Sequence, residues 1–460
     1  MQMVENMILE IIKSEGLAHK SYFIGSNGEA AVIDPRRDCD SYVYYSKKHD
    51  MQITHIFETH CNEDYVTGSM ELSKRVGAPI YHSKNLDFAY GNMVEDGDKF
   101  KIGEIQMKVI ETPGHTYESL SLLIKDKTIS EDVYIIFTGD TLFAGEVGRT
   151  DLYGDDKREE MAGKLYDSLH NKIMPLGDHV LVFPAHGSGS VCGKDIRESE
   201  FTTVGYEKKT NPMLQKTKEG FIDSKLNEKM VKAPYFKKME VYNKDGAPLL
   251  CRLPYLRPLD IKELKESAET SQLVDVRMAA SFAGGHIPGT LNIWKHGLTY
   301  FAGWMLSYNR PIIIIDENNE HIDEIVRYLI RIGYDNIYGY LAGGFTHWAN
   351  SGEEIKKIDT WSVHELKERQ NDKSIFILDV REIGEREEGY IKGSHHIYVG
   401  DLKNHLDEVP DDKYIVIYCD TGNRASIAAS VLKINGYEEV ANVLGSIRAW
   451  KAAGYSLVKD

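Results

Sequence analysis

A repeated segment in the second half of the chain limits the possible folds more than any other feature of the sequence. The run LVDVR at 273–277 corresponds to ILDVR at 377–381. Three pairs of equivalent residues are 104, 103 and 102 positions apart: Asp275 and Asp379, Gly333 and Gly436, Trp348 and Trp450. Spacings that drift by so little over a whole domain are typical of a duplication. We therefore expect two copies of one domain, at residues 255–353 and 358–460.

Both copies alternate apolar strands with helical stretches. After the repeated DVR segment comes a glycine turn, GHIPG or GYIKG, and then a second apolar strand, PIIIID or YIVIYC. Alternating strands and helices are typical of a parallel α/β sheet. We expect one such sheet in each copy, with Trp348 and Trp450 in the two cores.

The second copy carries a cysteine directly after this strand. Cys419 is followed by a short loop that ends at Arg424, and we expect a helix from about Ala425; the loop residues are Asp420, Thr421, Gly422 and Asn423. Backbone N–H groups and a helix N-terminus aimed at sulfur lower the pKa of a thiol and stabilise a persulfide or oxyanion. The pattern C-x-x-G-x-R resembles the active loop of single-domain rhodanese sulfurtransferases. The resemblance implies that Cys419 carries sulfane sulfur and that Arg424 contributes a positive charge.

The first copy lacks this nucleophile. Asp316 stands where the second copy has Cys419, and no arginine closes the segment PIIIIDENNEH. Because a carboxylate cannot carry sulfane sulfur, we expect copy 255–353 to be a pseudo-rhodanese that acts as a spacer or docking surface. In the second copy, the charge of Asp420 should oppose anionic substrates and make turnover with thiosulfate poor.

The first 240 residues place polar side chains directly after short apolar strands. ITHIFETH ends at His60, VYIIFTGD ends at Asp140, His115 lies in TPGHT, and VLVFPAHG contains His186. Loops at strand ends gather catalytic groups. Two imidazoles and one carboxylate, from His60, His115 and Asp140, are the ligand set of non-haem Fe(II) oxygenases.

Together with the IDP segment at Asp34, these motifs resemble the metallo-β-lactamase superfamily, which implies an αββα sandwich at 1–240. The hydrolases of that superfamily carry HxHxDH, which supplies both halves of a dinuclear zinc centre. Here Asn62 and Tyr65 replace two of the histidines. An amide oxygen is a poor ligand, and a phenol, with a pKa near ~10, must lose its proton to bind well. We expect a second metal to be weak or absent.

The superfamily branch that works with one iron, at the equivalents of His60, His115 and Asp140, is the persulfide dioxygenase branch, and GRTD at 148–151 resembles it too. With SVCGK, GYEKKT and PYFKKM, essentially the whole chain resembles the bacterial persulfide dioxygenase-sulfurtransferase fusions. The resemblance implies one Fe(II) per chain, a small thiol persulfide and dioxygen as substrates, and sulfite or thiosulfate as products. It also implies sulfide detoxification and a homo-oligomer.

Further residues are candidates for contacts with the substrate or for support of the ligands. Two roles are open for Arg149, which would either hold a substrate carboxylate or lock Asp151 in its loop. His186 would support the metal site, touch substrate, or be a structural histidine. Cys192 would face the substrate entrance or be a partly buried structural thiol. The remaining candidates are Asp64 and Tyr65.

Two alternatives keep the same domains but change the metal. With zinc, the first domain would be a glyoxalase-II-like thioester hydrolase fused to a sulfurtransferase. With no metal, the chain would be a sulfur-relay binding protein whose N-terminal domain is inert. Iron differs from zinc by its redox chemistry, so the identity of the metal separates an oxygenase from a hydrolase.

Composition narrows the class and the compartment. The chain is 42% hydrophobic and 27% charged, and it has no apolar run near the ~18 residues that cross a bilayer, so we expect no membrane span. A formal charge of −16 argues against a nucleic-acid partner. The five cysteines show no paired spacing, and the start lacks the features of a signal peptide, so we expect free thiols and a cytoplasmic protein.

Overall fold

The computed structural model describes residues 7–127, 129–130, 132–193 and 195–459. The sequence predictions that involve the start of the chain, Lys194 and residue 460 partly lie outside these ranges. The chain divides into two compact units, Met1–Leu253 with Ile330–Gly333 and Pro254–Leu329 with Tyr334–Asp460. No helix within the described ranges has the length and apolar character needed to cross a membrane.

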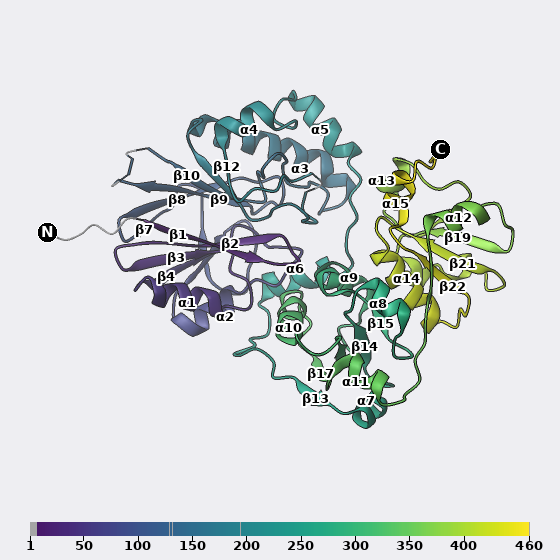
Figure 1. Ribbon diagram of the computed structural model, residues 1–460. Coiled ribbons are helices and arrows are strands. Elements are labelled where there is room, and N and C mark those ends of the chain that lie inside the picture. Colours follow the sequence, from purple (N-terminus) through teal and green to yellow (C-terminus); the bar gives the residue numbers. More distant parts are fainter. Residues whose placement is uncertain (1–6, 128, 131, 194, 460) are drawn as a thin grey trace. The chain divides into compact units, whose positions relative to one another are not determined.

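Two six-stranded sheets form the centre of the N-terminal unit (Figure 1). The first sheet has the strand order β1-β2-β3-β4-β5-β6, with strands β1 (Ile8–Ser14), β2 (His19–Ser26), β3 (Glu29–Ile33), β4 (Gln52–Phe57), β5 (Ile80–Ser83) and β6 (Asn92–Val94). The second has the order β12-β11-β10-β9-β8-β7, with strands β7 (Lys99–Ile102), β8 (Ile105–Glu111), β9 (Leu120–Asp126), β10 (Ile135–Gly139), β11 (Leu181–Pro184) and β12 (Thr202–Thr203).

Alternation along the strands produces the layers of this unit. In β2, Tyr22 and Ile24 belong to the core between the two sheets, whereas Phe23 belongs to a cluster on the outer face of the first sheet. Successive side chains of a strand point to opposite faces, and β2 is buried at every position, so it must be covered on both sides. Helices therefore have to cover both outer faces.

The helices of the N-terminal unit supply this cover. Tyr42 of α1 (Asp40–Lys48) and Leu72 of α2 (Ser69–Val76) pack with the outer face of the first sheet. Leu165 of α3 (Asp155–Ser168), Val204 of α4 (Val204–Thr210) and Phe221 of α5 (Lys218–Asn227) pack with the second. The last helix of the unit is α6 (Phe236–Asp245). The predicted αββα sandwich is confirmed.

The second unit contains two five-stranded sheets with the same topology, β13-β17-β16-β14-β15 and β18-β22-β21-β19-β20, in which every pairing is parallel. The strands of the first copy are β13 (Arg257–Leu259), β14 (Gln272–Asp275), β15 (Leu291–Asn292), β16 (Ile312–Ile315) and β17 (Ile337–Leu341). Those of the second are β18 (Asp359–Trp361), β19 (Ile375–Asp379), β20 (His395–His396), β21 (Tyr414–Tyr418) and β22 (Val440–Val443). The predicted duplication of a parallel α/β domain is confirmed.

Helices pack around both of these sheets. In the first copy they are α7 (Ile261–Ser267), α8 (Ala279–Gly284), α9 (Leu298–Met305), α10 (Ile322–Arg331) and α11 (Gly344–Asn350). In the second copy they are α12 (Val363–Arg369), α13 (Ile383–Glu387), α14 (Asn423–Ile434) and α15 (Ser446–Ala452). Trp348 and Trp450 are buried in the respective cores, as expected.

The two copies also share local details. A capping box of Asp260 and Glu263 starts α7, and one of Ser362 and Glu365 starts α12. Each box satisfies helix N–H groups that would otherwise lack a partner. In both DVR segments the buried aspartate accepts the backbone N–H and the guanidinium of the arginine two residues later. These repeated aspartates thus hold the turn that follows the strand.

Buried hydrogen bonds join the two copies within this unit. The side-chain oxygen Oδ1 of Asn292, on β15, accepts a hydrogen bond from Ser426 Oγ of α14 at 2.6 Å. The backbone N–H of Asn292 donates to Ser430 Oγ, one helical turn further on, at 3.1 Å. Since α14 follows the Cys419 loop, the first copy contacts the helix next to the predicted sulfurtransferase site.

Candidate metal centre and sulfurtransferase loop

His60, His115 and Asp140 follow β4, β8 and β10, and their loops bring them together at one edge of the sandwich. Their ligand atoms all lie within 4.8 Å of one another. Asp140 Oδ2 is 3.9 Å from His60 Nε2 and 3.7 Å from His115 Nε2. All three side chains are buried.

Each histidine uses its Nδ1 to fix its ring. Thr59 Oγ1 donates to Asp34 Oδ2 at 2.8 Å and so accepts the Nδ1–H of His60, at 2.9 Å. The Nδ1–H of His115 donates to the carbonyl oxygen of Arg149 at 3.0 Å. The partner at Nδ1 sets the tautomer, which leaves the Nε2 lone pair of both rings for a metal.

The surroundings of the two histidines shift their pKa values in opposite directions. Burial lowers the pKa of His60 to about 4, although Asp140 opposes this change. Burial also acts to lower the pKa of His115, but the carboxylates of Glu63 and Asp140 outweigh it and raise that pKa to about 9. A metal ion at this position would replace the His115 proton, because a ligating imidazole must be neutral.

A second group of ligand-type side chains adjoins the first and consists of Asp64, His186 and Cys192. His186 Nδ1 donates to Asp140 at 2.8 Å, and His186 Nε2 lies 3.1 Å from Asp64 Oδ2. Burial alone would lower the pKa of His186, but Asp140 and Asp64 raise it well above its usual value. His186 therefore contacts Asp140 directly, and among the roles that the sequence left open for it this hydrogen bond favours support of the metal site.

Asn62 and Tyr65, which replace two histidines of the HxHxDH motif, do not provide the ligands that a second zinc ion usually has. Burial raises the pKa of the Tyr65 phenol well above its usual value. Its ring packs against His19, with the ring centroids 4.1 Å apart. The side-chain nitrogen of Asn62 donates to the carbonyl oxygen of His60, so this residue supports the loop.

Glu63 is a member of the site that the sequence interpretation missed. Its side chain is buried, and Oε2 lies 3.5 Å from Nε2 of His115. Its other oxygen, Oε1, accepts a hydrogen bond from Cys192 Sγ at 3.4 Å. The signal was present in the segment THCNEDY, where Glu63 is an additional acid, but the comparison with HxHxDH considered only the replaced histidine positions.

The guanidinium of Arg149 makes its hydrogen bonds with groups of the protein itself. Its Nε and Nη2 atoms donate to the two carboxylate oxygens of Asp151 at 2.7 and 2.8 Å, and Nη1 donates to the carbonyl oxygen of Val191 at 3.0 Å. Its side chain is fully buried. Of the two roles left open by the sequence, the geometry matches the one in which Arg149 locks Asp151.

The side chains of the first group fit a metal ion. Among the described residues, His60 Nε2, His115 Nε2 and Glu63 Oε2 are buried without a hydrogen bond of normal geometry. Buried polar atoms without partners are costly, and several that converge on one point indicate a missing charged partner. Imidazole nitrogen with carboxylate oxygen suits iron or zinc.

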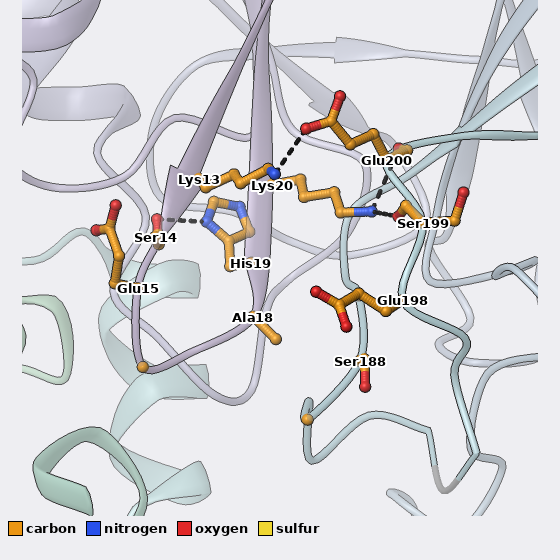
Figure 2. Close-up of a pocket in the computed structure, with 13 residues that line it drawn as sticks. Lys13, Ser14, Glu15, Ala18, His19, Lys20, Ser188, Glu198, Ser199 and Glu200 are labelled. Atoms are coloured by element: carbon orange, nitrogen blue, oxygen red, sulfur yellow. Dashed lines mark hydrogen bonds and ion pairs between the residues drawn. The ribbon is translucent and has the colours of Figure 1, made fainter. Parts of the chain in front are cut away.

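Two hollows flank the site. One, of about 310 Å³, is lined by residues that include Cys61, Glu63, Glu118 and Tyr153. The other, of about 700 Å³, is lined by residues that include His19, and Figure 2 shows the His19 ring held there by Ser14. The second hollow backs onto the part of the site that contains Tyr65 and His186, because the His19 ring contacts both.

The Cys419 loop of the second unit follows β21. Cys419 Sγ accepts the backbone N–H of Gly422 at 3.0 Å, and Ser446 Oγ lies 3.9 Å from the same sulfur. Gly422 adopts a φ of 110°, a left-handed conformation that lets the helix start directly after it. Helix α14 therefore begins at Asn423, two residues earlier than predicted. The N–H of Gly422 and the start of α14 therefore both lie at the Cys419 sulfur.

The charged residues of the loop are paired. Both Arg424 Nη atoms donate to the carboxylate of Glu385, at 2.5 and 2.6 Å, so the positive charge predicted here is shared with a neighbour on α13. Asp420 pairs with exposed Arg448 at 2.7 Å, and Thr421 is exposed. In the first copy, Asp316 follows β16 as Cys419 follows β21, and its carboxylate accepts the backbone N–H of His321.

Comparison with known proteins finds a family model for each half of the chain. The family model "Metallo-beta-lactamase superfamily" matches residues 15–186, and "Rhodanese-like domain" matches 260–351 and 362–453. The crystal structure of a metallo-beta-lactamase from Staphylococcus aureus is 30% identical, covers 74% of this chain and 99% of that chain, and superposes with a TM-score of 0.66. The chain belongs to the metallo-beta-lactamase superfamily. The predicted joining of such a domain to tandem rhodanese-like domains is confirmed.

Within the superfamily, the relatives include proteins of two activities. Human mitochondrial persulfide dioxygenase ETHE1 is 28% identical over 206 residues, which are 44% of this chain and 74% of that protein. Hydroxyacylglutathione hydrolase GloC of Haemophilus influenzae is 27% identical over 207 residues, which are 40% of this chain and 87% of that protein. Similarity alone therefore does not choose between an oxygenase and a hydrolase, and the choice depends on the site.

Proposed function

We propose that the chain oxidises the persulfide of a small thiol with dioxygen at one iron, and that Cys419 passes sulfane sulfur to or from the products. The observation that carries this proposal is the convergence of His60 Nε2, His115 Nε2 and Asp140 Oδ2 in a buried position. Two histidines and one carboxylate leave positions open on Fe(II), as in the non-haem oxygenases. Similarity to human persulfide dioxygenase supports the same reaction class.

The protein groups have separate tasks in this reaction. His60 and His115 are held by their Nδ1 bonds, and His186 holds Asp140, so the three ligands are oriented before a substrate arrives. Bound iron would supply the redox chemistry with dioxygen that zinc lacks. The terminal sulfur of the persulfide would gain two oxygen atoms, and water would then cleave the sulfur–sulfur bond to release sulfite and the thiol.

The Cys419 loop is suited to the second half of the proposal. A thiolate that accepts the N–H of Gly422 at the start of a helix can take a sulfane sulfur as a persulfide. Sulfite that attacks this outer sulfur would leave as thiosulfate and restore the thiolate. We propose that the two activities are coupled in a cytoplasmic homo-oligomer that detoxifies sulfide.

A zinc-dependent thioester hydrolase is the second candidate. It is favoured by the neighbouring group of Asp64, His186 and Cys192, which offers ligands for a second ion, and by the similarity to hydroxyacylglutathione hydrolase. Iron and zinc give different reactions from the same fold, so metal content separates the two candidates.

The proposal is tested by purifying the full chain without oxygen, measuring its metals, and recording oxygen uptake after glutathione persulfide is added. We expect one iron per chain, with oxygen consumption and sulfite release. Iron-loaded protein that consumes no oxygen would reject the oxygenase, and zinc with hydrolysis of a glutathione thioester would establish the second candidate.

Two variants test whether the sites are separate. Cys419→Ser should abolish sulfur transfer from thiosulfate and leave oxygen uptake largely intact, because the cysteine belongs to another compact unit. His115→Ala should do the opposite, since it removes a metal ligand. Loss of both activities in either variant would contradict independent sites.

A further inference from the structure

Helix α9 of the first copy presents two aromatic side chains to the second copy. Tyr300 and Trp304 are four residues apart, so they lie on the same face of this helix. The Tyr300 hydroxyl donates to Glu382 Oε1 at 2.8 Å, and the Trp304 ring packs against Tyr398 with the ring centroids 5.3 Å apart. A side chain at Gly400 would collide with the Trp304 ring. This face of α9 therefore packs closely on the second copy.

The contacts of α9 lie at the edge of the sheet that also carries the cysteine. Glu382, Tyr398 and Cys419 come after β19, β20 and β21, which are parallel neighbours, so their carboxyl ends share one edge. Ligand sites of parallel α/β sheets lie at this edge. We propose that the first copy forms part of the sulfurtransferase site, with Tyr300 as a positioning residue for Arg424. The inference rests on the proposed sulfur transfer by Cys419.

A series of hydrogen bonds connects Tyr300 with Arg424. Tyr300 bonds the side chain of Glu382, and the backbone N–H of Glu382 donates to Glu385 Oε2 at 3.0 Å. Both Nη atoms of Arg424 donate to the carboxylate of Glu385, at 2.5 and 2.6 Å. The phenol of the first copy is therefore bonded to the residue that orients the partner of Arg424.

The charges of these groups act on one another and on the cysteine. Burial acts to lower the pKa of Arg424, but Glu385 raises it above its usual value, and Cys419 and Glu382 raise it further. Burial raises the pKa of Tyr300 and Glu382 raises it further, whereas Arg424 acts to lower it. Two carboxylates therefore act on one guanidinium. Glu385 is bonded to it, whereas Glu382 is bonded to Tyr300.

The Tyr300 hydroxyl thus determines how much positive charge Arg424 offers to a sulfur donor. An anionic donor such as thiosulfate needs this charge next to Cys419. Without the hydroxyl, the Glu382 carboxylate loses its donor and turns to the nearest cation, which is Arg424. A second carboxylate on the guanidinium would then oppose the donor. The copy without a nucleophile therefore sets the affinity of the other copy for anions.

The experiment compares two alkylating agents on the full chain. Iodoacetate is anionic and iodoacetamide is neutral, so the ratio of their rates at Cys419, measured by mass spectrometry of its peptide, reports the local charge. Tyr300→Phe should lower this ratio about 5-fold and raise the KM for thiosulfate by a similar factor, with kcat little changed. Tyr328→Phe is the matched control, because that hydroxyl donates to Glu324 at 2.6 Å within the first copy. It should leave the ratio unchanged.

A second substitution separates positioning from a merely structural role. Glu382→Gln should raise the alkylation ratio above that of the wild type, because a negative charge near Arg424 is lost. Adding Tyr300→Phe to Glu382→Gln should then change nothing further, since no second carboxylate remains to pair with the guanidinium.

An unchanged ratio in Tyr300→Phe, or a double variant with a ratio as low as that of Tyr300→Phe, would overturn the inference. If circular dichroism shows that Tyr300→Phe does not fold, Glu382→Gln decides alone, and a ratio equal to or below that of the wild type would overturn it. Wild-type protein that transfers no sulfur from thiosulfate would reject the proposed sulfurtransferase, whereas the alkylation ratios would still decide the positioning role of Tyr300.

Discussion

Replacing Asn292 tests whether the first rhodanese-like copy supports the second. The side chain of Asn292 is buried and makes three hydrogen bonds. Nδ2 donates to the carbonyl oxygens of Asp275 and Arg277 at 3.0 and 2.9 Å, and Oδ1 accepts from Ser426 at 2.6 Å. At about 1 kcal/mol for each bond, Asn292→Ala should lower the free energy of unfolding by about 3 kcal/mol.

The contribution of the bond between the two copies is isolated by a double-mutant cycle. Ser426→Ala leaves the Asn292 oxygen buried without its donor and should cost about 1 to 2 kcal/mol. The double variant should be less destabilised than the sum of the single variants, with a coupling of about 1 kcal/mol. Ser430→Ala is the control, because Ser430 lies on the same helix but bonds the backbone N–H of Asn292 rather than its side chain.

Urea unfolding of the full chain followed by tryptophan fluorescence is the assay. All five tryptophans lie in the rhodanese half, so this signal reports on that half alone; they are Trp294, Trp304, Trp348, Trp361 and Trp450. The rate of sulfur transfer from thiosulfate is measured in parallel without urea, and we expect it to fall in Asn292→Ala because α14 follows the Cys419 loop. A change of less than about 1 kcal/mol, or a coupling of zero, would refute a supporting role for this contact.

Three further variants test other parts of the structure. Burial lowers the pKa of His286 from 6.5 to about 4. The contribution of this histidine to the free energy of unfolding is therefore complete above pH 6.5 and is lost as the pH falls through 4. His286→Gln should remove about 3 kcal/mol of this acid dependence, measured by urea unfolding at pH values on both sides of that window. Asp151→Asn leaves Arg149 buried without its counter-charge, and calorimetry should show a loss of about 3 to 5 kcal/mol; an unchanged melting temperature would mean that the pair is not structural. Gly400→Ala places a methyl group against the Trp304 ring and should cost about 1 to 3 kcal/mol in tryptophan-monitored unfolding, whereas a neutral result would show that this contact is loose.

The sequence predicted the architecture well because the signals for it are local or periodic. The spacing between Asp275 and Asp379 revealed the duplication, and strands that alternate with helices predicted parallel sheets. The apolar runs before His60 and Asp140 located two of the strands whose ends form the metal centre. The start of α14 was placed two residues late, because the conformation of Gly422 that ends the loop is not encoded in an apolar pattern.

Which side chains complete the site depended on contacts between distant segments. Glu63 belongs to the site because the loop after β8 brings His115 Nε2 to 3.5 Å from its carboxylate, and Arg149 pairs with Asp151 because the fold buries both side by side. Local sequence alone therefore fixed the residue types available for chemistry and the strands that carry them. The tertiary structure decided which of their atoms face one another, because that depends on how loops far apart in the chain pack at the end of the sandwich.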